Sequence, residues 1–208
     1  MSVRLPYRVV KRVFDVSAST VLLGIAAPLM AGISICIRNE SPGPVFFSHD
    51  RVGESGRHFR MHKFRSMKTG SEDLEATLND DDLEAYYQEY KLTDDPRVTS
   101  IGRKLRRNSL DELPQLFNVI KGDMSLVGPR PIMESELGFY TEDEQHRLLS
   151  VRPGITGYWQ VNGRNEATYQ TGRRQELELY YADNASLLLD TLILVKTPAA
   201  VFLGKGAK

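Results

Sequence analysis

The chain has 208 residues, of which 41% are hydrophobic and 26% charged, and 27 Lys and Arg residues balance 27 Asp and Glu residues. This length and composition indicate one globular domain with room for a membrane segment, and they exclude a disordered chain, a collagen-like fibre and a polytopic transporter. The net charge of zero argues against a nucleic-acid-binding protein, and the single cysteine, Cys36, excludes a disulfide framework and a cysteine-based zinc site.

The neutral total hides an uneven distribution of charge along the chain. Residues 1–70 hold 11 basic and 4 acidic side chains, residues 71–95 hold 1 and 10, residues 96–131 hold 7 and 3, and residues 132–208 hold 8 and 10. Two basic segments are therefore separated by an acidic insert at 71–95, and each has to be interpreted separately.

The first predicted element is an uncharged run of 22 residues from Val16 to Ile37. As a helix it would be about 33 Å long, enough for the hydrocarbon core of a bilayer, and Pro28 near its middle predicts a kink. Four interpretations compete: a spanning helix, a kinked re-entrant helix that enters and leaves on one side, a buried core helix and a cleaved signal peptide. Basic residues at both ends of the run favour the re-entrant form.

A β-hairpin is predicted next, after the turn-rich segment Ser41–Pro44. Its strands lie around Val45–Phe47 and within Arg57–Met67, and a loop bounded by glycines joins them. Phe59 and Met61 alternate with polar residues and are expected to face the core.

The acidic segment 71–91 is predicted to be helical and mostly solvated, with a thin apolar face. Asp80–Asp82 is compatible with the DxD motif of a metal-dependent glycosyltransferase that would release UDP. An ordinary exposed, charged segment is the favoured interpretation, because no βαβ pattern surrounds the three aspartates.

Residues 103–131 carry the strongest chemical pattern. Apolar residues at helical spacing follow Asp111 and Glu112, and Gly122 predicts the end of this helix. The N-cap is either Ser109 or Asp111, and both choices place the two carboxylates at the helix N-terminus, where the dipole stabilises negative charge.

An isolated acidic pair would be ordinary helix capping, but basic residues surround this one. Two carboxylates can share a Mg²⁺ that also binds diphosphate oxygens, and arginines suit phosphate oxygens. The pattern therefore predicts a polyanionic substrate. The basic residues are Lys63, Arg65, Arg103, Lys104, Arg106, Arg107 and Arg130.

Near the C-terminus, Leu187 to Leu203 is a second apolar stretch, interrupted by Asp190, Lys196 and Pro198. It is predicted to form an interfacial helix, and it would also suit the interface of a homodimer.

Six segments, in this order, resemble the motifs of the bacterial sugar transferase family, the monotopic polyprenyl-phosphate phosphoglycosyl transferases that start polysaccharide and glycan assembly. One departure is visible: Ala27 precedes Pro28 where family members often have serine. The six segments are Lys11–Asp15, Pro42–Phe47, Lys63–Met67, Ser109–Gln115, Ser125–Pro131 and Val151–Gly157.

The resemblance implies a two-step transfer. Asp111 would attack the β-phosphorus of a UDP-sugar, release UMP and carry the phosphosugar, which polyprenyl phosphate would then remove. Glu112 would help to hold Mg²⁺ or position the incoming phosphate. Phosphate contacts are expected from Arg106 and Arg130, and further from Lys63 and Arg65. Arg152, Gln160 and Arg164 are expected to reach the nucleotide or sugar, with a structural role in their loop as an equal alternative.

We therefore expect a mainly α-helical protein with a small β-hairpin. Residues 1–40 would form the basic N-terminus and re-entrant membrane helix, and residues 41–208 the cytosolic and interfacial catalytic domain. The expected location is the bacterial inner membrane, with the catalytic face in the cytoplasm and membrane lipids as partners. A non-catalytic membrane adaptor is the alternative outside the enzymes, and the sequence does not distinguish galactose, glucose and N-acetylated sugars.

Overall fold

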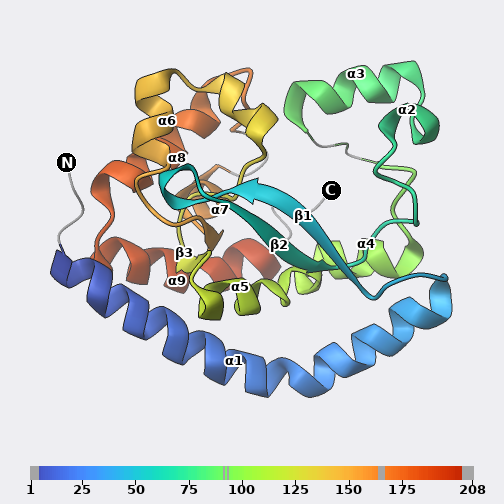
Figure 1. Ribbon diagram of the computed structural model, residues 1–208, viewed down its shortest axis with the longest axis horizontal. Helices are drawn as coiled ribbons and strands as arrows, with labels where there is room; N and C mark the ends of the chain where they lie inside the picture. The colour runs from blue at the N-terminus through green and yellow to red at the C-terminus, as the bar shows by residue number, and fades with distance from the viewer. Residues whose placement is uncertain (1–4, 91, 93, 164–166, 203–208) are drawn as a thin grey trace.

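The computed structural model describes residues 5–90, 92, 94–163 and 167–202. One long helix, α1 (Leu5–Glu40), runs along one side of a body built from shorter helices and two small sheets (Figure 1). The predicted fold class, mainly helical with one antiparallel hairpin, is confirmed at this level.

α1 is continuous over 36 residues although Pro28 lies inside it. Its length is about 54 Å, and the helix is bent with its concave side toward the body (Figure 1). Proline removes one backbone hydrogen bond and crowds the preceding turn, which accounts for the bend. Among the described residues, α1 is the helix whose length and hydropathy would allow a membrane crossing.

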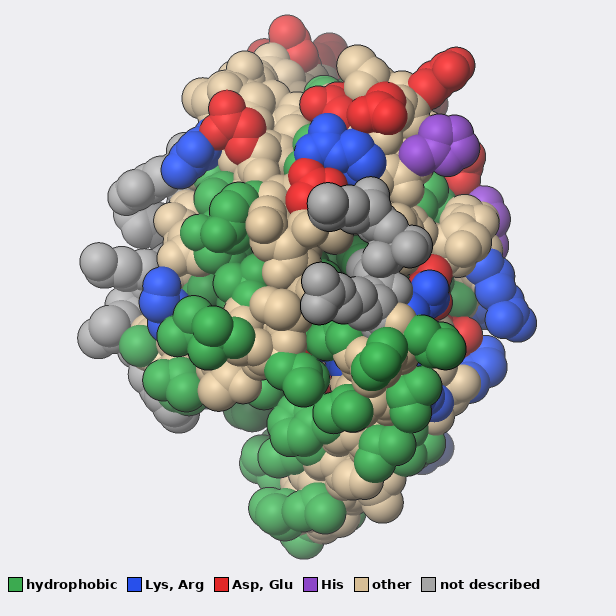
Figure 2. Space-filling view, turned by 90° about the vertical axis from the view of Figure 1, so that its left-hand side faces the viewer, with side chains coloured by type: hydrophobic (Ala, Val, Ile, Leu, Met, Phe, Trp, Pro, Cys, Tyr) green, Lys and Arg blue, Asp and Glu red, His purple; other side chains and the backbone are tan. Residues whose placement is uncertain are grey.

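The two faces of α1 differ in what covers them. Met30, Ile33 and Ile37 pack against the body, whereas the opposite face leaves large hydrophobic side chains exposed. Figure 2 shows such side chains gathered over the lower part of the molecule, where α1 lies. The exposed set on α1 is Leu5, Val9, Val10, Val13, Phe14, Val21, Leu22, Ile25, Leu29 and Ile35.

Polar contacts fix the first half of α1 to the body. The buried carboxylate of Asp15 accepts hydrogen bonds from the Ser125 hydroxyl (2.7 Å) and the Leu126 backbone N–H (3.1 Å). One turn earlier, the guanidinium of Arg12 donates to the carbonyls of Val119 and Ile120. The segment Lys11–Asp15, recognised in the sequence as a motif, thus supplies the bonds that dock α1.

The end of α1 is fixed by Arg65. Its guanidinium donates to the carbonyls of Ser41 (2.8 Å) and Pro42 (2.6 Å), which follow the last turn. The carboxylate of Glu40 also accepts a hydrogen bond from the backbone N–H of Ile101 (2.9 Å). A buried cation at the C-terminus of a helix is favourable because the helix dipole is negative there.

The predicted hairpin is confirmed. β1 (Phe46–Val52) pairs antiparallel with β2 (His58–Phe64), and the turn between them contains the 3₁₀ segment η1 (Glu54–Gly56). Phe59 and Met61 face the core as predicted, where they pack against Leu116 and Val119.

The acidic segment is helical, as predicted, but it is divided into α2 (Leu74–Thr77) and α3 (Asp80–Glu89). The division occurs because Asn79 caps a new helix by accepting from the Asp82 backbone N–H (2.8 Å). Asp80–Asp82 therefore form the first turn of α3, where acidic residues suit the helix dipole.

The predicted start of the helix after Asp111 is wrong. α4 (Ser100–Arg107) is followed by the 3₁₀ turn η2 (Leu110–Glu112), and α5 (Gln115–Lys121) begins only after Pro114. Pro114 has no N–H to bond four residues back, so the chain passes through three-residue-spaced bonds before the α-helix forms. The predicted end at Gly122, which has φ 99°, is confirmed.

A second sheet pairs β3 (Ser125–Val127) in parallel with β4 (Gly154–Thr156), and nothing in the sequence analysis predicted it. The backbones approach so closely that a Cβ on Gly154 would lie 2.0 Å from the Gly128 nitrogen. Between the two strands lie η3 (Glu134–Phe139) and α6 (Glu142–Leu148). After β4 come α7 (Tyr158–Asn162) and α8 (Arg173–Asn184).

The last helix, α9 (Leu187–Phe202), agrees with the predicted interfacial helix in having one exposed apolar face. Leu188 and Val195 are each 73% exposed, whereas Ile193 is buried in the main core. Asp190, which interrupts the apolar pattern, accepts bonds from Lys11 (2.8 Å) and Tyr181 (2.6 Å). This carboxylate therefore joins α9 to α1 and α8.

The docking of α1 through Asp15 gives a first prediction. Asp15→Ala would leave the Leu126 N–H and the Ser125 hydroxyl buried without their partner, which costs about 2 kcal/mol or more. We expect the thermal unfolding midpoint in detergent to fall by about 5 °C or more. Asp50→Ala, at an exposed carboxylate, is the matched control. Equal midpoints for the two variants would contradict the docking role.

Candidate active site

Asp111 and Glu112 occupy the η2 turn between α4 and α5. Ser109 enters this turn in the left-handed conformation (φ 54°), and the backbone N–H of Glu112 bonds to the Ser109 carbonyl (3.3 Å). The side chain of Asp111 is 8% exposed and that of Glu112 is 33% exposed. The turn thus holds one carboxylate in the protein and presents the other to solvent.

Lys63 on β2 bridges the two carboxylates. Its Nζ lies 2.8 Å from Oε1 of Glu112 and 4.0 Å from Oδ2 of Asp111. The pairing of Lys63 with Phe47 places it at the open end of the hairpin. The structure therefore brings together the acidic pair and one of the predicted phosphate-binding residues.

Burial raises the pKa of Asp111 above its usual range, and the neighbouring charge of Glu112 adds to this effect. The positive charges of Lys63 and Arg106 oppose it. The ionised form of Asp111 in the free protein therefore depends on these two cations.

Arg106 and Arg65 have different surroundings. Arg106, in the last turn of α4, donates from Nε to the Ser66 hydroxyl (2.9 Å), and its charge acts on Asp111. Arg65 is buried, and its guanidinium nitrogens Nη1 and Nη2 donate to carbonyls after α1 and to Thr69. Arg65 therefore stabilises the C-terminal end of α1, whereas the charge of Arg106 acts on the acidic pair.

Arg130 follows β3 in the Gly128–Pro131 loop. Its backbone N–H bonds to the carboxylate of Glu178 (3.1 Å), and Nη1 lies 3.4 Å from Oε1 of Glu136. Burial disfavours its charged form, yet the charges of Glu136, Glu112 and Glu178 raise the pKa of Arg130 above its usual value. Since Glu112 contributes to this shift, Arg130 shares the electrostatic surroundings of the acidic pair.

Glu136, at the centre of these contacts, was missed by the sequence analysis. It is fully buried and accepts from the Tyr169 hydroxyl (3.0 Å), the Met133 N–H (2.8 Å) and Arg174 (3.4 Å), besides Arg130. Although burial favours its neutral form, Arg130 and Arg174 hold the pKa of Glu136 below its usual range. A glutamate shortly after the Gly-Pro-Arg-Pro segment is the one sequence signal, and it is a weak one.

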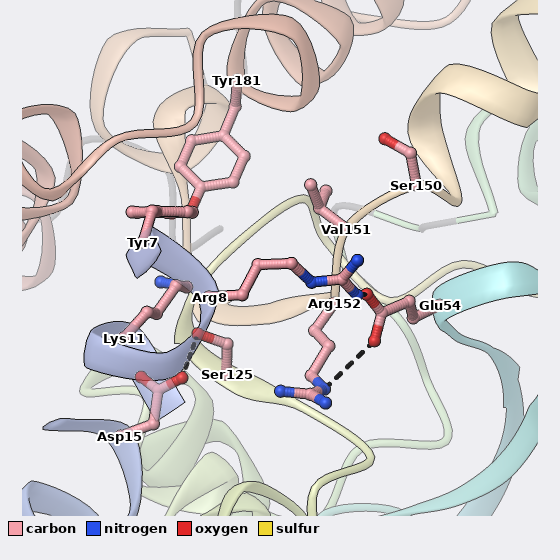
Figure 3. Close-up of a pocket in the computed structure, with 10 residues that line it drawn as sticks. All are labelled: Tyr7, Arg8, Lys11, Asp15, Glu54, Ser125, Ser150, Val151, Arg152 and Tyr181. Carbon is pink, nitrogen blue, oxygen red and sulfur yellow. Dashed lines mark hydrogen bonds and ion pairs between the residues drawn. The ribbon is translucent and has the colours of Figure 1, made fainter. Parts of the chain in front are cut away.

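Arg152 lies elsewhere. Its Nε is 3.2 Å from Oε2 of Glu54, in the turn of the hairpin, and Arg8 of α1 binds the same carboxylate. Figure 3 shows both guanidinium groups directed at Glu54 in a pocket beside the start of α1. The strand from His58 to Lys63 spans about 17 Å, so this pocket and the acidic pair lie at opposite ends of the hairpin.

The two remaining predicted residues add little. Gln160 lies on α7, and its buried Oε1 has no hydrogen-bond partner among the described residues. Arg164 lies outside the described residues. The described part of the chain contains no group of three or more His, Cys, Asp or Glu side chains placed to hold a metal ion. Asp111 and Glu112 are the carboxylates that lie near Lys63 and Arg106, two of the predicted phosphate-binding residues.

Comparison with known proteins identifies the family. The family described as Bacterial sugar transferase matches residues 6–204. The chain belongs to this family. The resemblance inferred from the six sequence segments is thereby confirmed, and so is the predicted class of enzyme at the level of the family.

Three relatives of this sugar transferase show how far the similarity extends. The chain is 45% identical to the undecaprenyl-phosphate galactose phosphotransferase of Salmonella typhimurium over 96% of its own length, but it spans only 42% of that protein. It is 44% identical to the exopolysaccharide production protein ExoY of Rhizobium meliloti, covering 95% of the chain and 87% of the relative. A UDP-N-acetylgalactosamine-undecaprenyl-phosphate N-acetylgalactosaminephosphotransferase of Aeromonas hydrophila is 40% identical, over 97% and 46% of the two lengths.

The contact between Lys63 and the acidic pair gives a prediction for the sugar transferase. Lys63→Met would remove a charge that lowers the pKa of Asp111, so this pKa would rise further. Less Asp111 would then be ionised at a given pH, and we expect the acid limb of the pH–rate profile for nucleotide release to move to higher pH. Lys121→Met, at an exposed lysine paired with Asp123, is the control. An unchanged acid limb in Lys63→Met would contradict this role.

Proposed function

We propose that the chain transfers a phosphosugar from a UDP-sugar to polyprenyl phosphate, with release of UMP, as an early membrane step of glycan assembly. The observation that carries this proposal is the buried carboxylate of Asp111 beside Lys63, Arg106 and the Arg130 loop, in a chain of the sugar transferase family. Two relatives are named as sugar phosphotransferases that act on undecaprenyl phosphate, and this supports the same class of reaction for the chain.

In the first step, an ionised Oδ of Asp111 forms a bond to the β-phosphorus of the UDP-sugar. The bond from this phosphorus to the bridging oxygen breaks, and UMP leaves with that electron pair. The phosphosugar is then held on Asp111 as an acyl phosphate. Lys63, Arg106 and Arg130 lower the energy of this step by balancing charge on the phosphoryl oxygens.

In the second step, an oxygen of polyprenyl phosphate attacks the same phosphorus, and the bond to Asp111 breaks. The products are polyprenyl-diphospho-sugar and a free carboxylate. Glu112 is more exposed than Asp111 and already binds Lys63, so it is well placed to orient a group that enters from solvent or membrane. Its charge also raises the pKa of Asp111, which makes that carboxylate a better nucleophile but a less abundant anion at low pH.

The donor set at Asp111 and Glu112 fits Mg²⁺. Magnesium in phosphoryl-transfer sites is usually held by one or two carboxylates together with substrate phosphates, and two carboxylate side chains are present here. When bound, the ion would neutralise charge on the diphosphate. Without it, Lys63 occupies the space between the carboxylates and balances their charge.

The arrangement of α1 supports a re-entrant or interfacial position in the membrane. Lys11 binds Asp190 near one end of the helix, and Glu40 binds the Ile101 N–H at the other, so the same polar body holds both ends. A spanning helix would carry that body through the hydrocarbon, which is unfavourable. Three basic residues that precede the apolar run are bonded within the protein: Arg8, Lys11 and Arg12.

The reaction is tested by Asp111→Asn, which keeps the size of the side chain and removes its charge. UDP-galactose and UDP-N-acetylgalactosamine come first in a screen of UDP-sugars, because these sugars appear in the names of relatives. With polyprenyl phosphate present, wild-type protein should release UMP, and intact-mass spectrometry should detect a phosphosugar adduct. Asp111→Asn should lower UMP release by at least about a thousandfold and form no adduct.

Asp123→Asn, near the other end of α5, is the control for this substitution. Normal turnover in Asp111→Asn would refute the covalent mechanism. Release of UDP in place of UMP, together with its loss in Asp82→Asn, would favour the DxD alternative. No nucleotide release with any UDP-sugar would favour a membrane adaptor.

The position of α1 is tested by labelling its two ends. Ser2→Cys and Asn39→Cys, each in a Cys36→Ser background, should react with a membrane-impermeant maleimide from the same side only. In intact spheroplasts we expect neither cysteine to react, and after permeabilisation we expect both to react. Reaction of one end alone in intact spheroplasts would mean a spanning helix.

A further inference from the structure

Arg51, near the end of β1, is a buried arginine without an acidic partner. It is 9% exposed, and no carboxylate among the described residues forms an ion pair with it. Its Nη1 donates to Nδ1 of His49 and to the Asp50 carbonyl (3.1 Å), and its Nε has no hydrogen-bond partner in the part of the chain that the structure describes. Buried arginines are ordinarily paired with an anion, since an unpaired buried charge is costly.

A second arginine increases this positive charge. Burial and the charge of Arg130 together lower the pKa of Arg51 to about 10. Glu136, the carboxylate whose charge opposes this shift, already accepts bonds from Arg130 and Arg174. Burial also raises the pKa of Glu178 to about 7, so this second carboxylate of the cluster is only partly ionised near neutral pH. The three arginines of this cluster, Arg51, Arg130 and Arg174, thus outnumber its two carboxylates, Glu136 and Glu178.

Arg51 lies on the same face of the hairpin as Lys63, which contacts the acidic pair. Arg51, His49 and Phe47 oppose Phe59, Met61 and Lys63, so these side chains belong to one face of the hairpin. Arg51 is about 13 Å along the strand from the Lys63 level, a distance that two long side chains can close around neighbouring phosphates. The register of the hairpin places His49 between the levels of Arg51 and Lys63, where burial and then the charges of these two cations lower the pKa of His49.

We propose that Arg51 and Arg130 form a phosphate-binding subsite next to Lys63, filled by a phosphate group of one of the two substrates. This inference rests on the proposed function for the identity of those substrates. A phosphate of the ligand would then accept a hydrogen bond from Nε and balance the excess of positive charge.

The first experiment separates a ligand-binding role from a structural one. It uses the full chain in detergent with Arg51→Met, the charge-retaining Arg51→Lys, and Arg60→Met as an exposed control on the same hairpin. Without ligand, Arg51→Met should unfold at the same or a higher temperature, because it removes an uncompensated charge. UMP and inorganic pyrophosphate should raise the midpoint of wild type and Arg60→Met, and their dissociation constants should be at least about tenfold higher for Arg51→Met.

The kinetic arm identifies which substrate supplies the phosphate. A rise of about tenfold or more in KM for the UDP-sugar assigns the subsite to the nucleotide, and a rise in KM for polyprenyl phosphate assigns it to the acceptor. Arg51→Lys should recover part of either loss. The proposal is overturned if Arg51→Met binds UMP and pyrophosphate like wild type, whatever its unfolding temperature. The measurement of UMP and pyrophosphate binding needs no turnover. It therefore tests the subsite even if no UDP-sugar reacts and the proposed function is wrong.

Discussion

The structure depends on how an apolar helix is held against a polar body. α1 is too hydrophobic on one face for water, and on the other face it carries a buried carboxylate, Asp15, whose partners are in β3. Arg12 and Arg65 bind carbonyl groups at the ends of α5 and α1, where the helix dipoles favour a cation. These few bonds fix the body at a set height above the exposed apolar face, so the level of the active site relative to a bilayer follows from them.

The active site is connected to this docking through short segments. Lys63 and Arg65 are separated by one residue, and they serve the acidic pair and the end of α1 respectively. β3 receives the bonds from Asp15 and leads directly into the loop that carries Arg130. A displacement of α1 would therefore reach both sides of the candidate site, so the docking of the apolar helix and the geometry of the site depend on the same framework.

The sequence predicted those parts of the protein whose signals are local. The hairpin is marked by glycines and by alternation, and the end of α5 is marked by Gly122, so both were found. The start of α5 was misplaced because the effect of Pro114 extends backward over the 3₁₀ turn. β3 and β4 are three residues each and exist only through pairing across 26 intervening positions, for which no local pattern gives a signal.

The sequence indicated which charged residues are important better than it indicated which groups they contact. Lys63 and Arg106 act on the acidic pair, whereas Arg65 is held at a helix end and Arg152 at Glu54. Arg51 and Glu136 were overlooked, because burial in a charged cluster is a property of the fold and not of the surrounding sequence.

The contact between Gly128 and Gly154 has a wider consequence. Two stretches with separate places in the chain meet there with no room for a side chain, so neither can change shape alone. The loop bearing Arg130 and the loop bearing Arg152 behave as a single rigid corner. A substitution that adds a side chain at either glycine would therefore displace both loops together, and with them Arg130 and Arg152.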